Sequence, residues 1–107
     1  MKKNKNADNN QINVIIKTSG EILPLPLPAT GVTYSWEELK GFVGGLPESV
    51  RVHREVEIIV DGDGHPKGLP INPVATMIYH SYLAALGHSS DHPLAGDVLI
   101  VEARFLE

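Results

Sequence analysis

Histidines and carboxylates near the end of the second predicted helix are the side chains of this sequence most suited to metal chemistry. His88 and His92 bracket Asp91 in a short loop, and His80 lies on the helix before it, so three nitrogen donors and a carboxylate could meet around a metal ion. Their spacing fits no established zinc pattern. We therefore interpret the segment as a polar loop and expect no metal site, which leaves a small metal-dependent hydrolase as the least favoured function.

Acidic residues in the middle of the chain offer two further candidates. Asp61-Gly62-Asp63-Gly64 begins like a calcium-binding loop, but the sixth position holds Pro66 where glycine is needed, and the twelfth holds Asn72 where glutamate is needed. Because Asp-Gly pairs between extended segments form tight turns, we interpret this segment as a turn. Glu55 and Glu57 could form an acid–base pair on one strand face, although the solvent face of a strand is the simpler interpretation.

The start of the second predicted helix is the strongest candidate for a small-ligand site. Asn72-Pro73 combines an N-cap residue with a proline at the first helical position, and the free amides of such a start can hold an anion. One hypothesis is therefore the sequestration of an anionic, nucleotide-like ligand. The alternative is that Asn72 only caps the helix. The candidate binding residues are Lys67, Gly68, Asn72, Thr76 and His80.

No complete catalytic set accompanies these residues. The sequence has no cysteine, no Gly-x-Ser-x-Gly nucleophile elbow and no GxxxxGK[ST] phosphate-binding loop. We therefore expect a protein without enzymatic activity and without a cofactor.

The first half of the chain predicts two strands and a helix. Alternating apolar residues over 11–18 indicate a strand, with a turn at Ser19-Gly20. Prolines at every second position over 24–28 predict an edge strand, which we favour over a polyproline ligand for aromatic grooves. Ser35-Trp36-Glu37-Glu38 is a capping box that begins a helix, and Gly44-Gly45 ends it.

The second half predicts a strand, a helix and a last strand. Alternation over 50–60 indicates one strand, and the second helix runs from Asn72 to about Leu86, where Gly87 ends it. Residues 97–105 form a strand whose nearly continuous apolar centre indicates a central position. This order predicts an α+β fold, with a single small sheet, mostly antiparallel, and two helices on one face.

The second predicted helix is apolar on more than one side, because only Thr76, His80 and Ser81 form a polar strip. With just one other short helix in the chain, a second copy is the natural cover, so we expect a homo-oligomer. The alternative is a leader or loop lying across the helix. The residues that we assign to the interface are Tyr79, Tyr82, Leu83 and Leu86.

Length and charge limit the remaining functions. The 107 residues suffice for one domain, and we expect a disordered polar leader at 1–10 and a single domain at 11–107. Three of the 9 basic and one of the 13 acidic residues lie in that leader, so the predicted domain is acidic. This balance disfavours direct binding of nucleic acid. No apolar segment is long enough for a membrane helix, and we expect a cytoplasmic protein.

Several segments together resemble one uncharacterised family. Residues 68–76 read GLPINPVAT, 96–101 read GDVLIV, 39–46 read LKGFVGGL and 60–64 read VDGDG. The set is similar to a domain family of phages, plasmids and bacteria, over residues 11–101. The sequence departs from that family at Leu46-Pro47-Glu48, where an aromatic residue and Ile-Glu usually follow VGG. The resemblance implies an accessory protein of a mobile element and no particular reaction.

The leading expectation is a small non-enzymatic accessory protein of a phage or plasmid that binds a host protein, as a counter-defence or regulatory factor. The acidic domain, the apolar second helix and the incomplete catalytic sets support it. Binding of a small anionic ligand at the start of the second helix is the alternative.

Overall fold

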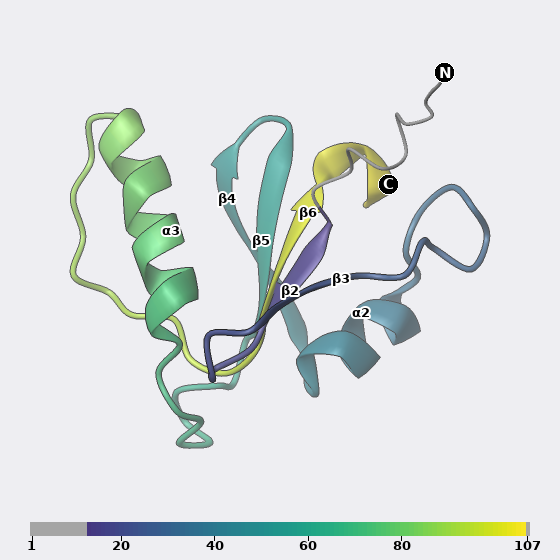
Figure 1. The fold of residues 1–107 in the computed structure, drawn as a ribbon, viewed down its shortest axis with the longest axis horizontal. Coiled ribbons are helices and arrows are strands. Elements are labelled where there is room, and N and C mark those ends of the chain that lie inside the picture. Colours follow the sequence, from purple (N-terminus) through teal and green to yellow (C-terminus); the bar gives the residue numbers. More distant parts are fainter. Residues whose placement is uncertain (1–12, 107) are drawn as a thin grey trace.

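The computed structural model describes residues 13–106, so the predicted leader lies outside the described residues. Residues 13–106 form one five-stranded antiparallel sheet and two α-helices (Figure 1). The prediction of an α+β fold with one antiparallel sheet is confirmed. None of the described helices is long and apolar enough to cross a membrane. The elements are β2 (Val14–Ile16), β3 (Ile22–Pro24), α2 (Trp36–Val43), β4 (Pro47–His53), β5 (Val56–Asp61), α3 (Pro73–Ala85), β6 (Val98–Glu102) and the 3₁₀ turn η1 (Ala103–Phe105).

The strand order is β3-β2-β6-β5-β4, which places the last strand at the centre of the sheet as predicted. β6 pairs with β2 through Leu99 opposite Ile15, and with β5 through Ile100 opposite Ile58. β3 forms one edge, in agreement with the alternating prolines that follow its first residues. β6 therefore joins the pair β2 and β3 on one side to the pair β4 and β5 on the other.

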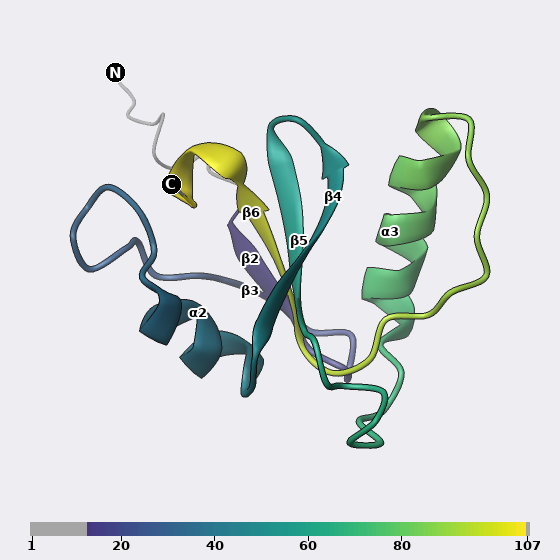
Figure 2. The same ribbon diagram turned by 180° about the vertical axis from the view of Figure 1, so that it is seen from behind.

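The two helices lie on opposite faces of the sheet (Figures 1 and 2). Neighbouring residues of a strand point to opposite faces, and accordingly Ile58 and Ile100 join the core under α3, whereas Ile59 and Leu99 join the core under α2. The expectation of both helices on one face is wrong, because strands that are apolar on both sides need a layer on each. The helical residues packed on these cores are Val74, Ala75, Ile78, Tyr79 and Tyr82 of α3, and Leu39, Phe42 and Val43 of α2.

The caps of both helices are those that the sequence predicts. Ser35 Oγ accepts from the Glu38 amide at 3.1 Å, and Glu38 Oε1 accepts from the Ser35 amide at 2.8 Å. The amides of Ser35 and Ala29 hold the pKa of the Glu38 carboxyl below its ordinary value. Gly44 ends α2 with a φ of 79°, and Gly87 follows α3 with a φ of 81°. Glycine adopts this left-handed conformation without strain, which explains both helix ends.

Residues 47–61 form a hairpin of two strands and not the single strand expected over 50–60. β4 and β5 pair across a turn at Arg54-Glu55, with His53 opposite Val56. The expectation was wrong because Arg-Glu lacks the glycine, asparagine or proline that marks most tight turns. Instead, the Glu55 amide donates to His53 Nδ1 at 3.1 Å. The hairpin places β4 at the second edge of the sheet.

Candidate functional site on helix α3

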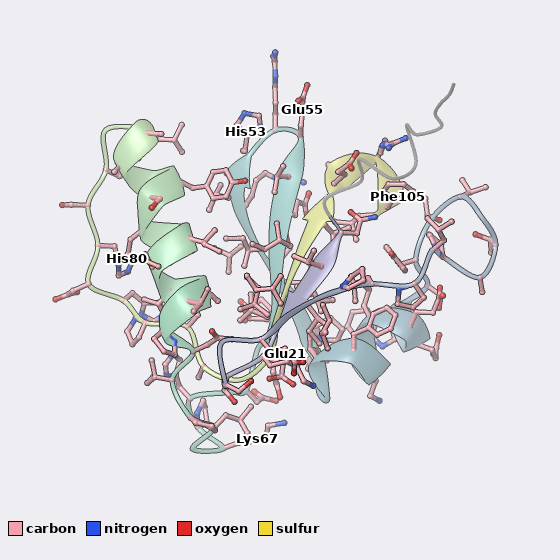
Figure 3. The ribbon with its side chains drawn as sticks, viewed as in Figure 1. Glu21, His53, Glu55, Lys67, His80 and Phe105 are labelled. Carbon is pink, nitrogen blue, oxygen red and sulfur yellow. The ribbon has the colours of Figure 1, made fainter. Side chains whose placement is uncertain are left out.

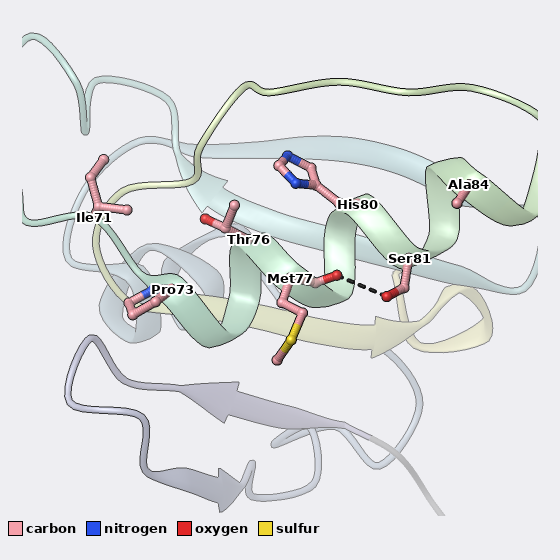
Figure 4. Close-up of a pocket in the computed structure, with 7 residues that line it drawn as sticks. All are labelled: Ile71, Pro73, Thr76, Met77, His80, Ser81 and Ala84. Atoms are coloured by element: carbon pink, nitrogen blue, oxygen red, sulfur yellow. Dashed lines mark hydrogen bonds between the residues drawn. The ribbon is translucent and has the colours of Figure 1, made fainter.

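Helix α3 has no charged side chain along its 13 residues. Its inner side meets the sheet, where Ala75 is 1% exposed, whereas Met77 on its outer side is 62% exposed. A shallow groove of about 580 Å³ runs along that outer side (Figure 4). We name it the α3 groove. The residues that line it are Ile71, Pro73, Thr76, Met77, His80, Ser81 and Ala84.

The segment after α3 runs back beside the helix (Figure 1) and bonds to Thr76 and His80 of its polar strip, whereas Ser81 is exposed. His80 Nε2 lies 2.8 Å from the main-chain oxygen of His92, and the Leu94 amide donates to Thr76 Oγ1 at 2.9 Å. The Asn72 amide donates to the Leu94 carbonyl at 2.8 Å. The few polar groups of α3 are thus bonded to the same chain, and its most exposed large side chain, Met77, is apolar.

Asn72, the predicted centre of an anion site, is buried and fully hydrogen-bonded through its side chain. Oδ1 accepts from the Ala75 amide at 3.1 Å, and Nδ2 donates to the carbonyls of Ile16 and Gly96 at 2.8 and 2.9 Å. The residue is 0% exposed. The capping interpretation is therefore confirmed, and the side chain also joins the start of α3 to β2 and to the turn before β6.

Lys67 forms an ion pair within the turn that follows β5. Its Nζ lies 2.5 Å from Asp61 Oδ2, and Asp61 Oδ1 accepts from the Asp63 amide at 2.9 Å. Burial raises the pKa of Asp61, but the bonds from Lys67 and Asp63 outweigh burial and hold the pKa below its ordinary value. Gly68, with a φ of 73°, turns the chain toward α3.

The five residues predicted to bind an anion therefore do not assemble into one ligand site. Figure 3 shows Lys67 at the turn before α3 and His80 on the helix itself. Lys67 is paired with Asp61, and Asn72 is enclosed. Only Thr76 and His80 line the α3 groove, and both are bonded to the segment beside it.

The four residues predicted for an oligomer interface are divided between the two sides of α3. Tyr79 and Tyr82 pack against the core of the same chain and are partly buried by it. Leu83 is half-buried, and Leu86, just after the helix, is 54% exposed. The apolar residues on the inner side of α3 thus pack on the sheet, whereas those on the outer side are exposed.

The residues considered for a metal site, His80, His88, Asp91 and His92, do not converge on one point. His80 bonds a main-chain oxygen of the segment that contains His88, Asp91 and His92, and within residues 13–106 no group of three His, Asp or Glu side chains is placed to hold a metal ion. Instead, the His92 ring lies 5.4 Å from the ring of His65. The sequence gives no signal for this pair, because the two residues come together only through the positions of two loops.

Glu57 is a buried carboxylate, contrary to the solvent-facing position expected from the sequence. It is 8% exposed, and it accepts from Ser49 Oγ at 2.5 Å and from Arg51 Nη2 at 2.6 Å. The expectation that Glu57 lies on a solvent face is wrong, because β5 is covered on both faces. Glu55 lies at the hairpin end (Figure 3), so the two do not form a dyad. A glutamate inside the apolar run 56–60 was the available signal, since a buried charge requires partners.

Comparison of the chain with protein-family models, curated proteins and solved structures found no match. The function proposed below therefore rests on the geometry of this chain.

Proposed function

We propose that this protein acts by binding another protein through the α3 groove. The observation that carries the proposal is the exposure of Met77 and Ile71, 62% and 47%, along a helix without a charged side chain. A surface helix ordinarily places charged or polar residues on its outer side. Exposed apolar surface is typical of interaction sites, and four of the seven residues that line the groove are apolar: Ile71, Pro73, Met77 and Ala84.

The proposed partner presents an apolar segment flanked by basic residues. Full burial of a methionine or isoleucine side chain contributes about 1.5–3 kcal/mol, and Met77 and Ile71 retain roughly half of this because they are 62% and 47% exposed. Ser81 and Ala84 are small, so the partner can approach the helix closely at that end. The chain has 13 acidic against 9 basic residues, which favours basic residues around the contact. Under the resemblance to a phage and plasmid family, this partner is a host protein.

Photo-crosslinking in cells of the organism that encodes the protein tests the proposal. A photoreactive residue replaces Met77 in the groove, and the control replaces Val32, which is 67% exposed in the loop before α2. We expect one defined protein to be crosslinked from position 77 and not from position 32. We also expect Ser81→Arg to abolish that crosslink, because an arginine there fills the groove with a charge.

Titration of the chain with the purified crosslinked protein completes the test. We expect Ser81→Arg to weaken binding by about tenfold or more, with an unchanged unfolding midpoint, because Ser81 is exposed and bonds only the Met77 carbonyl. Identical crosslinks from both positions, or an unaltered affinity of the variant, contradict the proposal. A crosslink to a second copy alone replaces partner binding with self-association.

A further inference from the structure

A second cavity lies on the inner side of α3, between the helix and the ends of β4 and β5. Its volume is about 330 Å³, which is at the lower end of the range for small-ligand sites. Val60 and Leu94, 9% and 4% exposed, give it an apolar base. We name it the Glu48 pocket. The polar side chains that line it include those of Glu48, His65, Tyr79 and His92.

Two imidazole rings line the pocket side by side. The rings of His65 and His92 have centroids 5.4 Å apart and planes inclined by 58°. His65 Nε2 lies 2.9 Å from the Pro93 carbonyl oxygen, and since a carbonyl only accepts, this nitrogen carries a proton and the ring is held. Both residues are exposed, so the held ring of His65 and the neighbouring ring of His92 offer aromatic surface to a flat ligand.

Glu48 brings a negative charge to this pocket. Its Oε1 lies close to Gly62, where an added Cβ would be only 2.9 Å away, and Gly62 also lines the pocket. Within residues 13–106 no ion pair includes Glu48, and neither lysine nor arginine lines the pocket. Lys67, in the neighbouring turn, is engaged by Asp61. Asp61 also lines the pocket but is neutralised by this lysine. Glu48 is exposed, so its carboxylate stands at the opening of the pocket, where it attracts a cationic ligand.

We propose that the Glu48 pocket binds an alkylguanidinium group. A guanidinium is planar, stacks on aromatic rings and bonds a carboxylate through two parallel N–H groups. Its alkyl stem fits the apolar base formed by Val60 and Leu94. The proposal goes beyond protein docking at α3, because the α3 groove lies on the outer side of the helix. The group belongs either to a small free molecule or to an arginine side chain of a bound protein.

Titration of the whole chain with n-butylguanidine, followed by NMR, tests this site. We expect the resonances of His65, His92 and Tyr79 to shift and saturate. The neutral analogue n-butylurea has nearly the same shape, and we expect it to bind at least about tenfold more weakly, because it lacks the charge-assisted bond to Glu48. Equal binding of the two compounds, or no shift with n-butylguanidine, overturns the proposal.

Two charge-matched variants locate the site. We expect Glu48→Gln to weaken binding about tenfold or more, while Glu55→Gln removes the same charge at the hairpin turn and leaves binding unchanged. Unaltered binding by Glu48→Gln overturns the proposal. If that variant fails to fold, Gly62→Ala serves instead, because the added methyl group displaces the Glu48 carboxylate. Ser81→Arg should bind n-butylguanidine normally, which separates this site from the α3 groove.

A blocked pentapeptide with a central arginine distinguishes the two sources of the guanidinium. Tighter binding of the peptide than of n-butylguanidine assigns the pocket to an arginine of a bound protein. Weaker binding of the peptide assigns it to a free small molecule.

Discussion

Lys67 Nζ lies 2.5 Å from Asp61 Oδ2, so the lysine that precedes α3 is bound to the last residue of β5. The Asp61 side chain is 1% exposed and that of Lys67 is 45% exposed. A buried carboxylate is strongly disfavoured without a partner. Lys67 therefore stabilises the fold by neutralising Asp61, and it is not available to an anionic ligand.

Replacing Lys67 by methionine should lower the free energy of unfolding by about 1–3 kcal/mol at neutral pH. The folded-state pKa of Asp61 is below its ordinary value of 3.8, so the pair stabilises the fold fully above that value and is lost as the pH falls through the lowered pKa. Urea unfolding of Lys67→Met and the unmodified chain should therefore differ at pH 7 and converge in acid. An equal difference at both pH values would contradict this assignment.

Gly45 and Gly41 should respond in opposite ways to alanine. A Cβ at Gly45 would overlap the carboxyl group of Asp61, whereas a Cβ at Gly41 in α2 has no neighbour within 4 Å. We expect Gly45→Ala to destabilise the fold by about 1–3 kcal/mol through overpacking. Gly41→Ala should stabilise it by about 0.5–1 kcal/mol, because alanine is the better helix former. Thermal unfolding of the two variants measures both effects, and shifts of the same sign would refute the contrast.

Asn72→Ala should be among the most damaging single substitutions of a polar residue in the domain. The change leaves the carbonyls of Ile16 and Gly96 and the amide of Ala75 without their present partner. We expect a loss of about 2–5 kcal/mol in the free energy of unfolding. Ser19→Ala removes one exposed bond to the Glu21 amide and should change stability by less than about 0.5 kcal/mol. Chemical denaturation compares the two, and a similar effect of both would show that Asn72 is not a structural link.

Met77→Glu should leave the stability of the isolated chain nearly unchanged. The side chain is 62% exposed, so little apolar contact is lost on substitution, and we expect a change within about 0.5 kcal/mol. Met77 is therefore available for a partner without being needed for folding. A large loss of stability, measured by urea unfolding, would mean that the residue belongs to the core.

The local parts of this fold are predictable because single side chains determine them. The capping box at Ser35 and Glu38, the Asn72 cap and the proline-rich edge each follow from the hydrogen bonds that those residues can or cannot make. The placement of the two helices on opposite faces does not follow from single side chains, but from the pattern of a whole strand. The four apolar residues 98–101 indicate a strand that is covered on both faces, and such a strand implies one helix on each face of the sheet.

The candidate site was less predictable, because its character depends on long-range contacts. The apolar outer side of α3 is visible in the sequence, but which of its residues the sheet covers depends on the crossing of the helix over that sheet. The Glu48 pocket joins residues of two strands, a helix and two loops. The sequence holds no pattern for such a cluster. The hairpin that places Glu48 opposite Val60 was also hard to predict, because its turn lacks the usual turn residues.

The position of β6 also has a consequence for how the chain folds. Within the described residues, β2–β3 and β4–β5 are two hairpins that meet only through β6, which is the last strand in the sequence. Each hairpin closes over a short stretch of chain, whereas the pairing of β2 with β6 joins residues from opposite ends of the domain. Such distant pairing is slow to form. A chain that lacks residues 98–102 has no strand to pair with both β2 and β5, so the five-stranded sheet can form only after the last of these strands has been made.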